Sequence, residues 1–155
     1  MKSFSTKQVL QKALQASVVN IEDAKGIVDI AIASFNNVDS YGDIIRRGSF
    51  TKTFSQNFSR IKHVVDHGWD TSSIVGLPIK LWETDKYAMA SSQLNIDSDR
   101  GRNLFQLYKF FADNSRSLEH SIAYRIIKTQ DNEDISGYDI TELALREYTT
   151  CGWVS

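Results

Sequence analysis

Hydrophobic positions along the chain repeat with two different periods, and each period predicts a different kind of element. Apolar or β-branched runs bounded by turn residues are typical of strands. They cover residues 27–35, 61–66, 74–83, 87–95, 118–129 and 137–149. Apolar residues at three- and four-residue steps are typical of helices. They cover residues 6–17, 50–58 and 100–112.

Strands outnumber helices in this pattern, and strands and helices do not alternate regularly. We therefore expect an α+β fold that is mainly β. The last two strands are separated by the polar segment 130–136 and should form a long hairpin. Because 155 residues is the size of one domain, we expect a single domain at residues 26–155. An N-terminal helical extension at residues 1–25 should precede it.

Charge and composition narrow the class of protein. Eighteen Lys and Arg against nineteen Asp and Glu give a net charge of −1, which provides no overall electrostatic attraction to nucleic acid or to an anionic membrane. We therefore expect neither partner. No apolar run approaches the roughly 18 residues of a transmembrane helix. A single cysteine, Cys151, excludes an internal disulfide framework and a multi-cysteine metal site. These features indicate a soluble, intracellular protein.

The three histidines are compatible with metal binding, with general-base catalysis and with a structural role. His63 and His67 would share a face of an extended strand and could bind a metal, but zinc needs three or four ligands, and no third stands at a diagnostic spacing. His67 also follows Asp66 where the strand ends, and an imidazole held there is a candidate general base. A hydrogen-bonded structural role is the alternative for both residues and for His120.

Two further polar residues interrupt apolar strands. Ser121 stands early in the strand at 118–129, and its hydroxyl becomes a nucleophile only if a base removes its proton. Glu147 continues a face that Leu143 and Leu145 make apolar, where an unpaired carboxylate would be costly. An imidazole N–H would satisfy it. Ser121, His67 and Glu147 are thus a candidate nucleophile, base and orienting acid.

Two acidic segments are candidates for binding a cation. Residues 95–101 resemble a calcium loop, but the glycine is one position late and no glutamate closes it. Residues 37–43 could also hold a cation, although Asn, Asp and Gly are the usual residues of turns. At residues 95–101 we favour a loop in which Asp99 caps the following helix, and at residues 37–43 we favour a turn. We expect no metal and no cofactor.

Six short blocks, taken in order, resemble the prohead (procapsid maturation) proteases of tailed bacteriophages. The first is a strand, an Asp-rich turn and a Gly-Ser-Phe start to a helix, within residues 30–50. The other five follow in the family's order: Asp66-His67, Gly76-Leu77-Pro78, Asp99-Arg100-Gly101-Arg102, Ser121-Ile122-Ala123-Tyr124 and Leu145-Arg146-Glu147-Tyr148-Thr149. The resemblance spans roughly residues 26–150.

The resemblance implies a serine protease similar in fold to the herpesvirus assemblins, a β-barrel flanked by helices. By position, Ser121 matches the family's nucleophile, His67 its base and Glu147 its acidic third member. His63 is the alternative third member. The resemblance also implies the substrates: scaffolding protein, or the scaffolding segment of the major capsid protein, and the protease itself. The place would be the assembling procapsid in the host cytoplasm, and a homodimer is common among the assemblins.

The sequence departs from the family's pattern near both strands of the site. Ala123 stands where glycine is usual, and Tyr148-Thr149 replace a more typical Val-Ser. A non-catalytic capsid-assembly or scaffolding module on the same fold is therefore the alternative function. A cation-binding β-domain built on the two acidic segments is a third.

Overall fold

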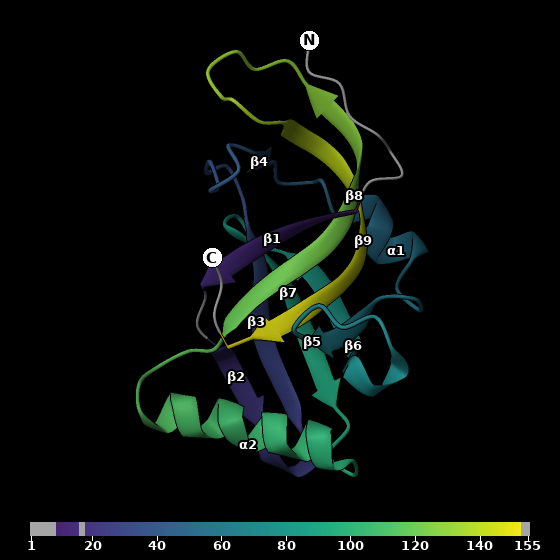
Figure 1. Cartoon of the computed structure of the whole chain (residues 1–155), viewed down its shortest axis with the longest axis vertical. Helices are drawn as coiled ribbons and strands as arrows, with labels where there is room; N and C mark the ends of the chain where they lie inside the picture. The colour runs from purple at the N-terminus through teal and green to yellow at the C-terminus, as the bar shows by residue number, and fades with distance from the viewer. Residues whose placement is uncertain (1–8, 16–17, 153–155) are drawn as a thin grey trace.

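The computed structural model describes residues 9–15 and 18–152, in which strands dominate and two helices flank the sheet (Figure 1). The strands are β1 (Val9–Gln15), β2 (Val18–Glu22), β3 (Ile27–Ser34), β4 (Ile44–Ile45), β5 (Lys62–Val65), β6 (Ile74–Glu83), β7 (Tyr87–Leu94), β8 (Glu119–Gln130) and β9 (Asp139–Cys151). The helices are α1 (Thr51–Gln56) and α2 (Asp99–Asp113), and short 3₁₀ turns span Asp23–Lys25 and Thr71–Ser73.

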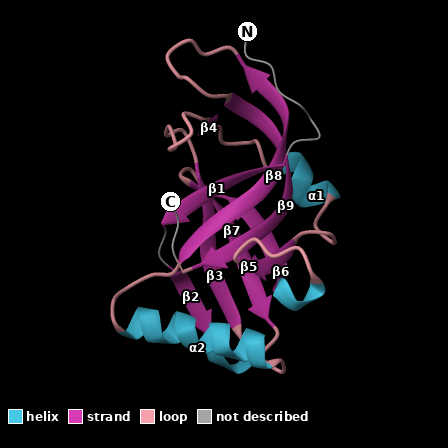
Figure 2. Cartoon of the chain, viewed as in Figure 1, coloured by secondary structure: helices cyan, strands magenta, loops and turns pink. Residues whose placement is uncertain are grey.

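All the described strands belong to one sheet. Their order is β1-β8-β9-β5-β6-β7-β3-β2, and β4 pairs with β9 beside this path. Strand β9 runs parallel to β4 and β5, whereas the other pairs are antiparallel. The sheet curves over on itself, so that β1 and β8 cross in front of β3 (Figure 2) and contact it. The hydrophobic core lies between the half of the sheet that contains β1 and β8 and the half that contains β3.

The sheet is mainly β as expected, but it is not closed into the expected barrel. A barrel requires its two edge strands to pair. Here β1 pairs with β8 and β2 with β3, and no pairing between β1 and β2 is present in the described part of the chain. The two halves of the sheet meet through side chains instead. Val28 and Ile30 of β3 share one apolar cluster with Ile122 and Tyr124 of β8.

The expected helix at residues 6–17 is wrong. Residues 9–15 form strand β1, which pairs with β8 along its whole length, from Val9 opposite Arg125 to Gln15 opposite Glu119. Apolar residues at helical steps also fit an edge strand, and pairing with a distant strand decided between the two. The second strand of the supposed extension, β2, pairs with β3. Residues 6–8 and 16–17 lie outside the described residues.

The remaining elements agree closely with the hydrophobic pattern. Strand β6 covers the predicted residues 74–83, and β8 and β9 form the predicted hairpin. Helix α2 buries Leu104, Phe105 and Tyr108 on one face. Its N-cap is Ser98, whose hydroxyl accepts the N–H of Gly101, rather than the expected Asp99. None of the described helices is long and apolar enough to cross a membrane.

Candidate active site

Strand β8 presents Ser121 on the face that points away from the core. Alternation along the strand places Ile122 and Tyr124 in the core cluster, so Ser121, Ala123 and Arg125 face the other way. Ser121 stands opposite Thr149 of β9. Only 3% of Ser121 is exposed, because neighbouring segments cover this face. A rigid strand therefore fixes the hydroxyl.

His67 lies in a tight turn immediately after β5. Asp66 and His67 both have φ of +51°, in the left-handed region that residues other than glycine rarely adopt. The turn is held by backbone bonds, since Gly68 N–H donates to Val65 O at 3.0 Å and Asp66 N–H to Thr150 O at 3.2 Å. The chain reverses direction here, so His67 does not continue the face of β5 that carries His63.

Gly68 lets this turn pack closely against the loop that follows it. A Cβ atom at Gly68 would lie 1.8 Å from Ser73 Oγ and 2.3 Å from Ser73 Cβ. Ser73 is itself fixed, because its hydroxyl donates to Asp70 Oδ1 at 2.6 Å. The absence of a side chain at Gly68 is therefore part of what places His67.

The three candidate catalytic side chains meet through the imidazole of His67. His67 Nε2 lies 2.9 Å from Ser121 Oγ, and His67 Nδ1 lies 2.7 Å from Glu147 Oε1. An ionised carboxylate only accepts hydrogen bonds, so Nδ1 carries the proton and donates it to Glu147. Nε2 is then free to accept the hydroxyl proton of Ser121. The structure thus brings Ser121 and Glu147, which lie 54 and 80 positions after His67, onto the two ring nitrogens of that histidine.

Glu147 reaches His67 for a different reason from the one its sequence position indicated. Ala123 pairs with Glu147 but Tyr124 pairs with Leu145, so Arg146 is an extra residue in β9. This β-bulge shifts the alternation of side chains. Leu145 faces the core, whereas Glu147 faces the same side as Ser121. The expectation that Glu147 shares a face with Leu145 is therefore wrong.

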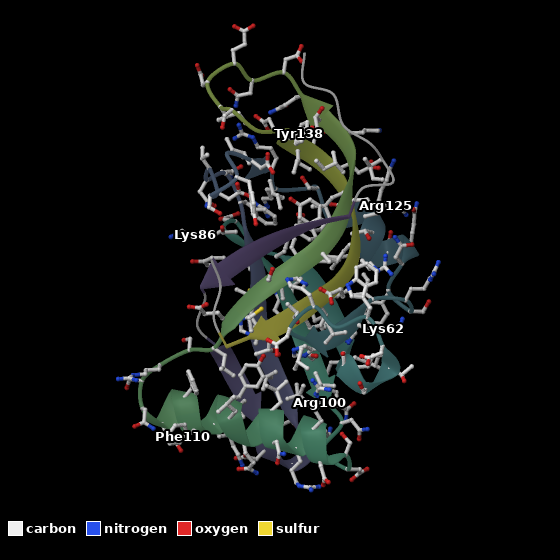
Figure 3. All side chains as sticks on the ribbon, viewed as in Figure 1. Lys62, Lys86, Arg100, Phe110, Arg125 and Tyr138 are labelled. Carbon is white, nitrogen blue, oxygen red and sulfur yellow. The ribbon has the colours of Figure 1, made fainter. Side chains whose placement is uncertain are left out.

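A hollow of about 600 Å³ opens beside His67 and Glu147. Its wall carries more cations than acids, and Figure 3 shows Lys62 and Arg125 on the same side of the molecule. The charged lining residues are Arg60, Lys62, Asp70, Arg125, Arg146 and Glu147. The guanidinium of Arg146 lies 3.7 Å above the ring of Trp69, whose exposed fraction is 65%. The hollow is large enough to receive part of a peptide.

The other two histidines lie in the core. His63 Nδ1 lies 2.9 Å from Ser92 Oγ, and its Nε2 lies 2.7 Å from Thr150 Oγ1. His120 Nε2 lies 2.8 Å from Tyr108 Oη. Burial lowers the pKa of His63 to about 3 and that of His120 to about 4. Both have hydrogen-bonded structural positions. Both ring nitrogens of His63 already bind Ser92 and Thr150 in the core, so His63 is not available as the third catalytic residue.

The proposed metal pairing of His63 with His67 also fails on geometry. Both ring nitrogens of each histidine already have hydrogen-bond partners. Among the described residues, no three His, Cys, Asp or Glu side chains gather as a metal-binding group. In the two acidic segments, oxygens of Asn95 and Asp39 accept backbone N–H groups of their own turns.

Sequence reasoning placed Thr149 in a motif block but assigned it no role in the site. Its hydroxyl accepts the backbone N–H of His67 and donates to Val64 O, both at 3.1 Å. The signal available was the hydroxyl two positions after Glu147 in that block, followed by a second threonine, Thr150. A buried hydroxyl there needs partners, although the sequence does not show which ones.

Comparison with known proteins agrees with this architecture. No protein-family model matches the sequence, and no curated protein is significantly similar to it. Among solved structures, the chain is similar to a phage protease, the capsid assembly protease gp21 of bacteriophage T4. The TM-score is 0.68 at 10% sequence identity, over 96% of this chain and 98% of that one. At this identity the similarity shows a shared fold, that of a phage prohead protease.

Proposed function

We propose that this protein is a serine endopeptidase that acts in the maturation of a phage procapsid. The observation that carries the proposal is the chain of hydrogen bonds from Ser121 through His67 to Glu147. A serine hydrolase requires a nucleophile, a base and an orienting acid in this arrangement, whatever their order in the sequence. The shared fold with a capsid assembly protease supports the same function.

In the first half of the reaction, Ser121 Oγ attacks the carbonyl carbon of a peptide bond. His67 Nε2 takes the hydroxyl proton as the new C–O bond forms. The imidazolium that results lies beside the carboxylate of Glu147, which offsets its positive charge and keeps the ring oriented. His67 then gives the proton to the leaving amine, and an acyl-enzyme remains on Ser121.

In the second half, water takes the place of the amine. His67 accepts a proton from the water, the hydroxide attacks the ester, and the proton returns to Ser121 as the acid leaves. Both tetrahedral intermediates carry an oxyanion that fixed donors must stabilise. Arg125 is the candidate side chain, because it lies on the same face of β8 as Ser121 and lines the hollow. The chemistry requires no cofactor.

We further propose that the substrates are scaffolding protein, or the scaffolding segment of the major capsid protein, and the protease itself. Packing enzyme and substrate into one procapsid raises their effective concentration, so an inefficient enzyme suffices there. The procapsid interior is accordingly the proposed place of action. A homodimer is a possible assembly, and each of its protomers would carry a complete set, because Ser121, His67 and Glu147 all come from one chain.

Co-expression with the capsid and scaffolding proteins of the same phage tests this function. We expect the wild type to shorten one of these proteins, as detected by intact mass, and S121A to leave all of them full length. S91A removes another buried serine hydroxyl, on β7, and should cleave normally. If the wild type and S121A both support capsid assembly with uncut proteins, the chain is instead a non-catalytic assembly module.

A further inference from the structure

The turn that carries His67 needs support from outside itself. Two successive residues, Asp66 and His67, have positive φ, and each such residue costs free energy unless its surroundings compensate. His67 also stands beyond the end of β5, so the sheet does not hold its backbone by regular pairing. A catalytic imidazole must nevertheless stay in place, since a displacement of about 1 Å can slow a reaction about a hundredfold.

Thr149 supplies a contact to His67 itself. Its side chain is fully buried, and its hydroxyl accepts the backbone N–H of His67 at 3.1 Å. The same hydroxyl donates its proton to Val64 O, also at 3.1 Å. The oxygen therefore joins the last part of β5 to the turn, and the donated bond fixes the direction in which its lone pairs point.

The position of Thr149 in the sheet connects this contact to the nucleophile. Thr149 stands opposite Ser121 in the antiparallel pair β8–β9, and opposite Val64 in the parallel pair β5–β9. It lies two positions beyond Glu147 on the same face of β9. One strand thus carries the orienting carboxylate, the partner of Ser121 and the support of the His67 backbone.

From this geometry, we infer that Thr149 is a positioning residue that holds the imidazole of His67 between Glu147 and Ser121. The inference rests on the proposed function. The hydrogen bonds of the Thr149 hydroxyl go to backbone atoms of His67 and Val64, and not to the imidazole. Thr149 acts through the backbone of the turn, so its removal should slow acylation of Ser121 while the protein remains folded.

Thr149→Val removes the hydroxyl and keeps the shape of the side chain, and Thr149→Ser keeps the hydroxyl. Thr150→Val is the matched control, because its buried hydroxyl also has two hydrogen bonds, to His63 and Tyr108, neither of which reaches the active site. The readout is the rate at which a fluorophosphonate labels Ser121. We expect Thr149→Val to label at least about tenfold more slowly. Thr149→Ser and Thr150→Val should label close to the wild-type rate.

A second readout follows the imidazole directly. In the wild type, the Nδ1 proton of His67 is hydrogen-bonded to Glu147 and should give a downfield proton NMR signal. Thr149→Val should shift or broaden that signal, whereas Thr150→Val should leave it in place. A merely structural role for Thr149 would lower the melting temperatures of both valine variants without this difference. Should Thr149→Val fail to fold, Thr149→Ala and Thr150→Ala give the same comparison.

Two results would overturn the inference. One is a folded Thr149→Val protein that labels at the wild-type rate, and the other is a Thr150→Val protein slowed as much as Thr149→Val. An unlabelled wild-type protein would instead overturn the proposed function. In that case the NMR comparison would still decide whether Thr149 holds the imidazole.

Discussion

The carboxylate of Glu147 lies 2.7 Å from the Nδ1 atom of His67 and is almost wholly shielded from solvent. A negative charge at this distance stabilises an imidazolium. The contribution of Glu147 should therefore depend on its charge as well as on its hydrogen bond.

Glu147→Gln keeps an acceptor oxygen for Nδ1–H and removes the charge. We expect the rate of fluorophosphonate labelling to fall by about a hundredfold or more, because the imidazolium formed on proton transfer loses its counter-charge and the tautomer is no longer enforced. Glu142→Gln is the control, since this carboxylate of the same strand pairs with Lys52 and Lys128 instead. Equal rates for both variants would contradict the role of Glu147.

Gly68→Ala tests the packing of the catalytic turn. The added methyl group would overlap Ser73, so we expect the free energy of unfolding to fall by about 1–3 kcal/mol. Gly152→Ala is the control, because a Cβ atom there meets nothing within 4 Å. Urea denaturation of the two variants measures the difference. A Gly68→Ala protein as stable as Gly152→Ala would show that the turn is loosely packed.

Among single residues, the sequence allowed Ser121 and His67 to be proposed from their side-chain chemistry and from the order of the motifs. Glu147 was proposed because it was expected to share a face with Leu145, and the bulge at Arg146 shows that expectation to be wrong. A bulge depends on how two strands meet, and residue types alone do not locate it. Thr149 was given no role because its partners, Val64 and His67, belong to another strand and the turn after it.

At the scale of elements, strand β9 is tied to the segment after β4 by an ion pair. Arg46 Nε and Nη2 each donate to a carboxylate oxygen of Asp139 at 2.8 Å, and Asn132 also donates to Asp139. These hydrogen bonds hold the pKa of the Asp139 carboxyl well below its usual range. The start of β9, the strand that carries Glu147 and Thr149, is thereby fixed against β4.

Asp139→Asn should lower the free energy of unfolding by about 2 kcal/mol at neutral pH. Because the folded state lowers the pKa of Asp139, the ionised pair stabilises the protein above the ordinary Asp pKa of about 3.9 and loses that effect as the pH falls further. The difference between wild type and variant should therefore shrink below about pH 4. Urea denaturation at several pH values measures it, and a constant difference would contradict the account.

Strands and helices with a clear period were predictable, including β6, β7 and the hairpin β8–β9. The N-terminal segment was not, because Val9, Leu10 and Leu14 fit a helix as well as a strand. Its true partner, β8, begins more than a hundred residues later in the chain. That the sheet is open rather than a closed barrel was unpredictable for the same reason. Closure depends on whether two edge strands distant in sequence pair, and no local pattern shows this.

At the scale of the whole molecule, one chain of hydrogen bonds crosses the core and joins helix α2 to four strands. Each link is between 2.7 and 2.9 Å. Its members are, in order, Tyr148, Ser92, His63, Thr150, Tyr108 and His120. Among the described residues, His120 Nδ1 at the end of this series has no hydrogen-bond partner. On β8 and β9 the members of this network are the sequence neighbours of Ser121 and Thr149.

This network predicts that acid weakens the fold well above the pH at which carboxylates titrate. Burial lowers the pKa of His63 to about 3 and that of His120 to about 4. The unfolded chain therefore binds more protons below about pH 6.5, and the free energy of unfolding should fall as the pH falls from there. We expect a loss of more than about 1 kcal/mol per pH unit between pH 6 and 5.

His120→Gln removes one titrating group and should make this loss shallower. Urea denaturation of wild type and variant between pH 7 and 5 gives both slopes. A wild-type free energy of unfolding that does not change over this range would show that the two histidines are not held neutral in the core.

Whether Ser121 is an activated nucleophile can be tested without knowledge of the substrate, by mapping a fluorophosphonate adduct. Treated wild-type protein, S121A and S91A are compared by intact mass, and the modified peptide is sequenced. We expect a single adduct on Ser121 in the wild type and in S91A, and none in S121A. No adduct in the wild type, or an adduct that persists in S121A, would contradict this expectation.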